Sequence, residues 1–173
     1  MSNNPRCLYD NSFKGFLSES VSSVFGTLCD RYNGVALTTT REAWMEEISI
    51  MRDVISQLDG DGHIVFEYDI PRLGKRIDVV LLLRGIIFCI EFKTGNEDEL
   101  KVMDVDQVLD YALDLSNFHK LSQGKVIVPI LVPVKYSGCS KIIQRSGYDD
   151  LVTDPLITGT PGLLGLIQRV LEQ

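Results

Sequence analysis

The sequence predicts an α/β (or α+β) protein in which helices flank a central mixed β-sheet. Two observations lead to this fold class. Apolar side chains recur at helical spacing through much of the first 58 residues, and from residue 63 onward the pattern changes to strand-like alternation and uninterrupted apolar runs. The expected order is two helices, three strands, a helix, a strand, a mixed region and a final helix. This order is typical of helices packed on a sheet.

Two helices are expected in the N-terminal third. The first is predicted to begin with Ser18 as its N-cap, because a hydroxyl oxygen can accept from the free N–H groups of the first turn. The second is predicted over about 39–58. Thr39 and Glu42 have the spacing of a capping box, and the glycine-rich segment 59–62 ends the helix.

The remaining elements are predicted from strand-like and helical patterns in turn. They are strands over 63–70, 75–84, 85–93 and 125–134, a helix over 103–120, and a final helix from about Pro161. Pro129 and Pro133 favour an edge or bulged position for the last strand, because proline cannot donate to a ladder. Glu67 shares a strand face with His63 and Asp69, which is expected to face solvent.

Size and composition indicate an ordinary globular chain. The 173 residues are 45% apolar, and we expect a loosely held arm over 1–15 followed by one domain over 16–173. No apolar run approaches the ~20 residues that span a bilayer, and no signal peptide is evident. Four scattered cysteines without CxxC spacing, with only two histidines, argue against structural zinc and favour a reducing cytoplasm. The net charge of −7 argues against a self-sufficient nucleic-acid binder.

Four charged residues are predicted to gather on one face of a hairpin. Arg84-Gly85 suits a two-residue turn, so facing residues have numbers that sum to 169. Asp78 then faces Glu91, and Arg76 faces Lys93, all on the same side of the strand pair because side chains alternate with period two.

Two facing carboxylates need a counter-charge. At about 5 Å they repel by roughly 3 kcal/mol at an effective dielectric constant of about 20. One interpretation places Mg²⁺ between Asp78 and Glu91, with Lys93 orienting or deprotonating a water, as in a phosphodiester hydrolase. The other is a buried ion quartet of Asp78, Arg76, Glu91 and Lys93 without metal. The pattern of residues alone leaves both open.

The same residues resemble a nuclease superfamily. Asp78, followed twelve residues later by Glu91-Phe-Lys93, resembles the PD-(D/E)XK signature. The segment 74–78, Gly-Lys-Arg-Ile-Asp, is similar to the GxxxD approach of RecB-type nucleases. Gln107 and Tyr111 match the QxxxY helix motif of that group, and they lie one helical turn apart.

Most of residues 13–135 resembles one family more closely. Five segments in the same order are similar to the nuclease-like N-terminal domain of bacterial and phage proteins whose later part is a superfamily 1 helicase-type ATPase, related to Schlafen-like helicases. The chain contains no GxxxxGK[ST] motif, so it is expected to be part of a longer helicase-type protein or to work with an ATPase in a partner chain. The resemblance also suggests a role in phage defence or DNA repair.

The resemblance implies a restriction-endonuclease-like core of order αβββαβ and a set of site residues. Asp78 and Glu91 would bind Mg²⁺ (or Mn²⁺), Lys93 would be the catalytic lysine, and Gln107 and Tyr111 would belong to the same site. The superfamily often adds an acid from the first core helix. Glu47 is chosen because it lies within the apolar stripe of its helix, where an acid needs a partner. Arg72, Lys75 and Arg76 form a basic cluster that could contact phosphates.

Three functions follow from these observations. The first is a Mg²⁺-dependent nuclease, with DNA favoured over RNA. The second is a catalytically inactive nuclease-like module that binds nucleic acid or regulates an ATPase, which the acidic balance favours. The third is an interaction domain with a structural ion quartet.

Overall fold

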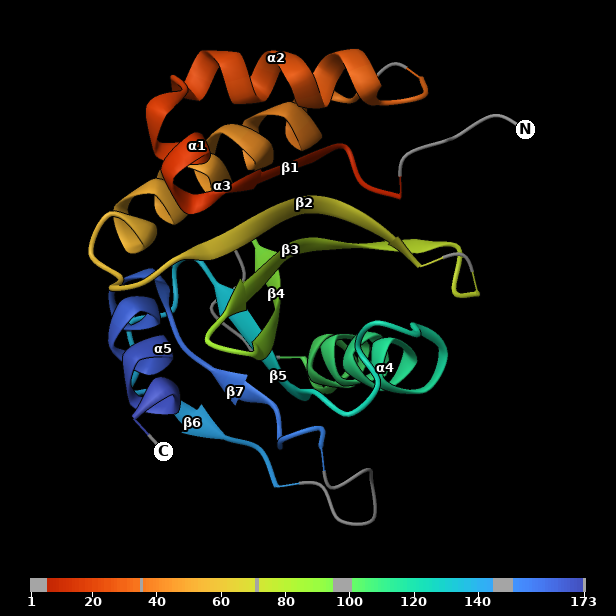
Figure 1. The fold of residues 1–173 in the computed structure, drawn as a ribbon, viewed down its shortest axis with the longest axis vertical. Helices are drawn as coiled ribbons and strands as arrows, with labels where there is room; N and C mark the ends of the chain where they lie inside the picture. The colour runs from red at the N-terminus through yellow and green to blue at the C-terminus, as the bar shows by residue number, and fades with distance from the viewer. Residues whose placement is uncertain (1–5, 35, 71, 95–100, 145–150, 173) are drawn as a thin grey trace.

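The chain forms a seven-stranded mixed β-sheet with five α-helices in a computed structural model that describes residues 6–34, 36–70, 72–94, 101–144 and 151–172 (Figure 1). The predicted α/β class is confirmed. The strands are β1 Tyr9–Ser12, β2 Gly62–Ile70, β3 Lys75–Leu83, β4 Ile86–Lys93, β5 Val126–Pro133, β6 Lys141–Ile142 and β7 Leu156–Ile157. The helices are α1 Phe13–Ser18, α2 Val21–Arg31, α3 Thr38–Ile55, α4 Val102–Phe118 and α5 Leu163–Leu171, which follows a short 3₁₀ turn at Thr160–Gly162.

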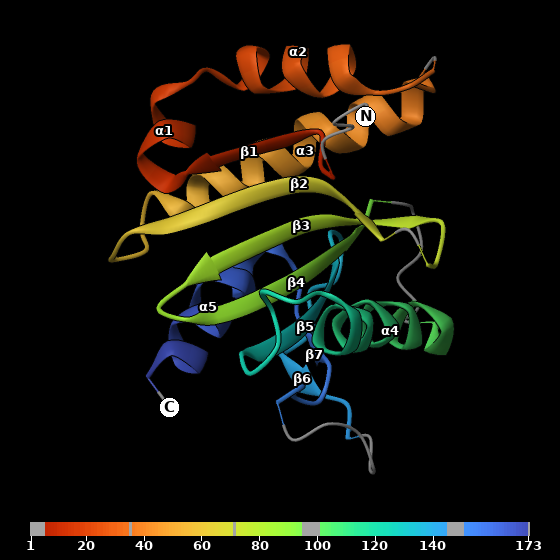
Figure 2. The same ribbon diagram turned by 45° about the vertical axis from the view of Figure 1, so that its right-hand side comes forward.

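The strand order in the sheet is β1-β2-β3-β4-β5-β7-β6. Strands β1 to β4 pair antiparallel, and β4, β5 and β7 pair parallel, so that α4 is the crossover between β4 and β5. Helices α1, α2, α3 and α5 lie on one side of the strongly twisted sheet and α4 lies on the other (Figures 1 and 2). Both faces of the central strands are therefore covered, which explains their nearly continuous apolar sequence.

Two apolar clusters fill the two sides of the sheet. The larger cluster packs residues of α1–α3 and α5 against β2–β5, with Trp44, Phe16 and Phe66 fully buried in it. The smaller cluster packs α4 against the opposite side of β3–β5, where Cys89 and Leu109 are buried. Side chains of the β3–β4 hairpin are therefore buried on both faces of the sheet, except near the turn, where Leu82 is exposed.

The expected N-terminal arm differs from the structure. Tyr9–Ser12 form the edge strand β1, paired antiparallel with β2, and Ser12 caps α1 through a hydrogen bond from the Gly15 N–H. Residues 1–5 lie outside the described part of the chain. The segment YDNS has no apolar alternation, so its strand conformation comes from pairing with β2.

The helix caps also differ from the expectation. Ser20, and not Ser18, caps α2 by accepting from the Ser23 N–H. Helix α3 begins at Thr38 with Leu37 at the N-cap position and no side-chain cap, so the predicted Thr39–Glu42 capping box does not form.

Strand β5 is central, and the expected edge position was wrong. It pairs with β4 on one side and with β7 on the other. The Ile127 N–H donates to the Leu151 carbonyl, on the side of β5 away from β4. Pro129 and Pro133 are an even number of residues from Ile127, so their nitrogens face the same side. The missing N–H groups therefore remove no bond from the β4–β5 ladder. No helix in the described ranges is long and apolar enough to cross a membrane.

Candidate active site at the divergence of β3 and β4

The β3–β4 hairpin has the predicted register near its turn. Arg84 and Gly85 both have positive φ, as a tight hairpin turn requires, and the pairs from Leu83–Ile86 to Val79–Ile90 sum to 169. The ladder then ends. The expected Asp78–Glu91 and Arg76–Lys93 pairs are not part of it, and the Asp78 Oδ2 instead accepts a hydrogen bond from the Phe92 N–H at 2.8 Å.

Strands β2 and β3 change face at the same level. Phe66 and Val79 pack in the cluster under α1–α3, whereas Ile70 and Ile77 pack in the cluster under α4. Strict alternation from Val79 would place Ile77 on the side of α3. The local change of direction at Glu67 and Asp78 replaces that alternation, so these two acids lie where the sheet is distorted.

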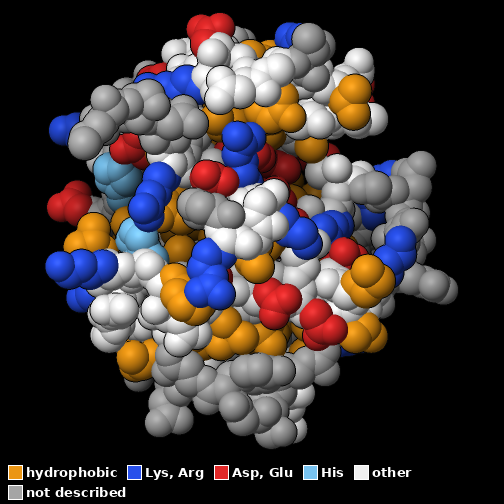
Figure 3. Space-filling model, turned by 90° about the vertical axis from the view of Figure 1, so that its right-hand side faces the viewer, with side chains coloured by type: hydrophobic (Ala, Val, Ile, Leu, Met, Phe, Trp, Pro, Cys, Tyr) orange, Lys and Arg blue, Asp and Glu red, His pale blue; other side chains and the backbone are white. Residues whose placement is uncertain are grey.

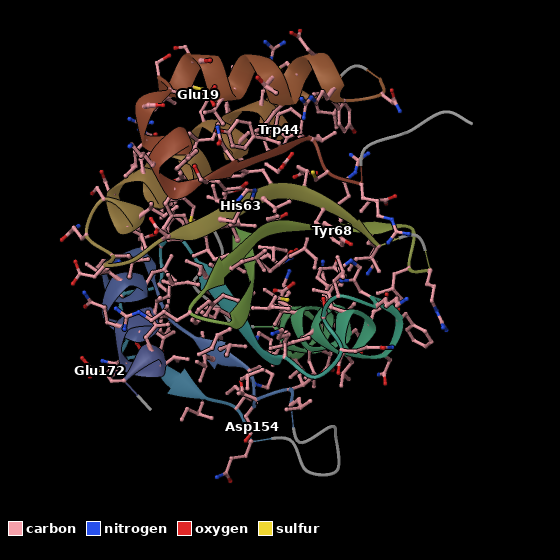
Figure 4. All side chains as sticks on the ribbon, in the orientation of Figure 1. Glu19, Trp44, His63, Tyr68, Asp154 and Glu172 are labelled. Atoms are coloured by element: carbon pink, nitrogen blue, oxygen red, sulfur yellow. The ribbon has the colours of Figure 1, made fainter. Side chains whose placement is uncertain are left out.

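Glu67 is a site residue that the sequence pattern did not identify. It lies between the β2–β3 pairs Phe66–Val79 and Tyr68–Ile77, at the level of Asp78, and has a φ of 56°, which is rare for a strand residue. Its Oε1 accepts from the indole N–H of Trp44 at 2.9 Å (Figure 4 labels Trp44). The expected solvated face is therefore wrong for Glu67, whose side chain is only 14% exposed.

Glu91 is the centre of a hydrogen-bond network with α4. Its Oε1 accepts from the Lys93 Nζ at 3.2 Å and from the Gln107 Nε2 at 2.9 Å. The Gln107 Oε1 accepts from Lys93 at 3.2 Å, and Gln107 also donates to the Tyr111 hydroxyl. The sequence prediction that Gln107 and Tyr111 point at the same place as Glu91 and Lys93 is confirmed as geometry.

Lys93 lies between two acids. Its Nζ is 3.2 Å from the Glu91 Oε1 and 3.5 Å from the Asp104 Oδ1 in the first turn of α4. Burial lowers the pKa of Lys93, but the charges of Glu91, Asp104 and Asp78 outweigh this effect, and the net pKa is raised. Lys93 is therefore a protonated ammonium group at neutral pH.

Glu47 projects from α3 into the same region, in agreement with its predicted position on the core-facing stripe. Glu47 and Glu91 are each only 4% exposed. Together with Glu67 and Asp78 they form what we call the carboxylate cluster. Burial, followed by the neighbouring negative charges, raises the pKa of Glu47 and of Asp78 well above its usual range. Burial also raises the pKa of Glu67 and Glu91, although Trp44 and Lys93, respectively, oppose that shift.

The carboxylate oxygens of the carboxylate cluster are suitable ligands for a hard cation. Two buried oxygens, Glu47 Oε2 and Glu91 Oε2, have no hydrogen-bond partner, and oxygen ligands of this kind are those that Mg²⁺ prefers. Within the described ranges, no group of three or more Asp, Glu, His or Cys side chains is arranged to hold a metal ion. The ligand types thus fit Mg²⁺, and binding through three carboxylates would require side-chain rotation.

The predicted basic cluster is divided in the structure. Arg72 lies 3.7 Å from the Asp114 carboxylate and stacks on the Phe118 ring at 3.5 Å, which ties the β2–β3 loop to the end of α4. Arg76 approaches Glu67 at 3.9 Å and lies over the Tyr32 ring, while Lys75 is exposed at the start of β3. On the face shown in Figure 3, basic and acidic side chains are interspersed.

The buried quartet expected as the metal-free alternative does not form. Arg76 pairs with Glu67 instead of balancing Asp78 and Glu91, because β3 has left β4 at this level. Of the two predicted cations, Lys93 alone contacts Glu91 among the described side chains. The carboxylate cluster therefore contains more acids than nearby bases.

Two signals would have identified the missed residues. The β2–β3 turn leaves Ile70 opposite Lys75, and continuing that register places Glu67 opposite Asp78. Asp104, interpreted from the sequence as a first-turn acid of α4, lies within reach of Lys93 because α4 crosses directly from β4 to β5.

Comparison of the chain with protein-family models, with curated proteins and with solved structures finds no match.

Proposed function

We propose that this chain is a Mg²⁺-dependent nuclease that hydrolyses phosphodiester bonds, with DNA as the favoured substrate. The observation that carries the proposal is the convergence of Asp78, Glu91 and Lys93 where β3 and β4 diverge, with Gln107 fixing both Glu91 and Lys93. The resemblance to PD-(D/E)XK nucleases in the sequence supports the same conclusion independently of the side-chain geometry.

The acids of the carboxylate cluster would hold the ion. Asp78 and Glu91 are the ligands, and Glu47 can add a third carboxylate from α3, where its Oε2 has no hydrogen-bond partner. A bound Mg²⁺ would polarise a phosphoryl oxygen and lower the pKa of a water. Gln107 and Tyr111 limit the rotation of Glu91, so that its second oxygen remains directed away from the hydrogen-bond network.

Lys93 contributes a positive charge. Its Nζ lies 3.2 Å from the Glu91 Oε1, beside the ligands proposed for the ion. An ammonium group has three N–H donors. The partners of the Lys93 ammonium are Glu91, Gln107 and Asp104, which hold it at the edge of the site. A cation at this place stabilises the negative charge that develops on a phosphate during hydrolysis.

The acidic balance of the chain suggests that it binds nucleic acid only weakly on its own. With a net charge of −7, nonspecific attraction to phosphates is weak, and a helicase-type ATPase domain in the same or a partner chain would supply the missing affinity. The ion itself would offset part of the negative charge of the carboxylate cluster.

A catalytically inactive nucleic-acid-binding or regulatory module is the second candidate. Two observations favour it. Lys93 is already paired with two acids, Glu91 and Asp104. In addition, the described residues contain no preformed metal site with three ligands. In that case the network around Glu91 would serve stability alone.

A cleavage assay separates the two candidates. Labelled single- and double-stranded DNA and RNA are incubated with the protein and Mg²⁺, Mn²⁺ or EDTA. We expect metal-dependent cutting of DNA that Asp78→Ala and Lys93→Ala abolish. Asp53→Ala on α3 and Lys14→Ala on α1 are matched controls at exposed positions and should cut normally. Folded wild-type protein that binds nucleic acid without cutting it would favour the inactive module.

A further inference from the structure

We propose that a small polar cavity lined by Arg6, Arg31 and Arg76 binds a backbone phosphate of the nucleic-acid strand next to the carboxylate cluster. This inference rests on the proposed function and assigns to Arg6 and Arg31 a role that the basic cluster of the sequence did not include. We call this site the arginine cavity. It has a volume of about 30 Å³ and is bordered also by Glu67, Asp69 and Asn33.

Three separate segments build the arginine cavity. Arg6 precedes β1, Arg31 ends α2, and Arg76 lies in β3. The Asp69 N–H donates to the Arg6 carbonyl at 2.7 Å, and an Arg31 Nη1 donates to the Leu8 carbonyl at 3.3 Å. These two bonds fix the chain before β1 between β2 and α2, so that residues 25 or more positions apart meet at one place.

The arginine cavity adjoins the carboxylate cluster directly. Glu67 belongs to both, since it lines the cavity and lies opposite Asp78 in the β2–β3 register. A strand whose phosphate occupies the arginine cavity therefore lies close to the ligands proposed for Mg²⁺.

The charges of the lining favour an anion. Three arginines against two acids leave a formal excess of one positive charge, in a chain whose net charge is −7. Arg76 approaches Glu67 only to 3.9 Å, which is longer than a hydrogen bond. Its guanidinium also lies over the Tyr32 ring at 5.5 Å, which orients the planar group. N–H donors in this fork geometry match phosphate oxygens.

The arginine cavity is large enough for a water-sized group. Its volume of about 30 Å³ exceeds the ~10–15 Å³ that a single water needs. One phosphate oxygen can enter while the phosphorus and the ester oxygens remain at the opening. A contact of this kind positions the strand without reading its sequence.

Binding in EDTA tests the inference without depending on cleavage. Fluorescence anisotropy is measured for a labelled single-stranded DNA oligonucleotide, with an RNA of the same sequence in parallel, over a series of salt concentrations. We expect Arg31→Gln and Arg76→Gln to weaken binding about tenfold at low salt and to reduce the slope of log affinity against log salt by about one. Arg41→Gln removes the same charge from α3, where Arg41 stacks on Phe25, and should leave both quantities unchanged.

Thermal melting identifies any variant that fails to fold, and Arg31→Lys, which keeps the charge but loses the fork, then replaces Arg31→Gln. An equal effect on DNA and RNA supports recognition of the shared phosphate. A folded Arg31 variant with wild-type affinity and salt slope would overturn the proposal that the arginine cavity binds a phosphate. A wild-type protein that binds neither oligonucleotide would overturn it as well. The cleavage assay reports on the proposed nuclease separately, because metal-dependent cutting can persist when the arginine cavity plays no part.

Discussion

The side chain of Asp78 holds the backbone of Phe92 where the two strands no longer pair. Continuing the β3–β4 register would place Ile77 opposite Phe92, but the Phe92 N–H donates to the Asp78 Oδ2 at 2.8 Å. One carboxylate oxygen thus stabilises the opening between the strands, and the other oxygen is available to the site. Asp78 has a structural and a proposed chemical role through different atoms.

Asn and Ala at position 78 should separate these roles. Asp78→Asn keeps an oxygen that accepts from Phe92 and removes a charge that burial disfavours, so we expect a fold at least as stable as wild type in EDTA, with cleavage reduced by at least about 100-fold. Asp78→Ala leaves the Phe92 N–H unpaired and should lower the free energy of unfolding by ~1–3 kcal/mol relative to Asp78→Asn. Urea unfolding and the cleavage assay are run on the same preparations. Substantial cutting by Asp78→Asn would contradict the assignment of Asp78 as a metal ligand.

Glu47 should destabilise the metal-free protein near neutral pH. Its folded-state pKa is raised by burial and neighbouring acids, so the folded form resists ionisation more than the unfolded chain does. The cost is absent below the ordinary pKa of a glutamate and develops as the pH rises above it. In EDTA near pH 7, Glu47→Gln should therefore raise the free energy of unfolding by about 1–2 kcal/mol, and the gain should shrink near pH 4.

Magnesium provides the second arm of the Glu47 experiment. Wild-type protein should melt at a higher temperature in Mg²⁺ than in EDTA, because an ion that binds only the folded state stabilises it. Glu47→Gln should show a smaller increase. Glu42→Gln, at an exposed position of the same helix, should behave like wild type. Equal magnesium-induced increases in wild type and Glu47→Gln would exclude Glu47 from the ion site.

Local patterns were sufficient to predict the hairpin, and this explains how much of the site was found. Arg84-Gly85 fixes the turn, the turn fixes the register, and the register holds as far as Val79–Ile90, the residues next to Asp78 and Glu91. Gln107 and Tyr111 follow from helical spacing on α4. Each of these relations depends on residues that are close in the chain or joined by one tight turn.

The remaining features depend on contacts between distant segments. The β3–β4 ladder ends at the level where Glu67 of β2 takes a left-handed conformation and accepts from Trp44 of α3, which no spacing rule encodes. Strand β5 can lie inside the sheet because its two prolines face β7 and not β4, and the sequence does not show which neighbour they face. The predicted pairing of Arg76 with Lys93 assumed an ideal β3–β4 register. In the structure the sheet is already distorted two residues before that pair would form.

Gln107 should support catalysis by fixing its neighbours. It donates to Glu91 and accepts from Lys93, so its removal frees both side chains. We expect Gln107→Ala to lower the cleavage rate about 10- to 100-fold, with a loss of stability of about 1–2 kcal/mol. Asn117→Ala is the matched control on α4, because the Asn117 amide donates within its own helix, to the Leu113 carbonyl. A rate for Gln107→Ala within about twofold of that control would show that Glu91 and Lys93 hold their positions unaided.

Tyr9 and Glu19 join β1 to the turn between α1 and α2, and their bond should make stability depend on pH. The Tyr9 hydroxyl donates to the Glu19 Oε1 at 2.8 Å, and Asn11 donates to the same oxygen at 3.0 Å. These bonds, with the one from Tyr9 contributing most, lower the pKa of Glu19. A lowered carboxylate pKa stabilises the fold above the unfolded-state pKa and ceases to do so as the pH falls through the folded-state value.

Tyr9→Phe should therefore lower the free energy of unfolding by about 1 kcal/mol near pH 7 and by less near pH 3. Urea unfolding at both pH values measures the difference. Tyr136→Phe removes a hydroxyl that donates to the Cys139 carbonyl at 3.3 Å, and it should show no such pH dependence because no carboxylate accepts its bond. A Tyr9→Phe deficit that is the same at both pH values would mean that the hydroxyl stabilises β1 through bonds that do not need the ionised form of Glu19, such as the one it accepts from the Asn11 amide at 3.3 Å.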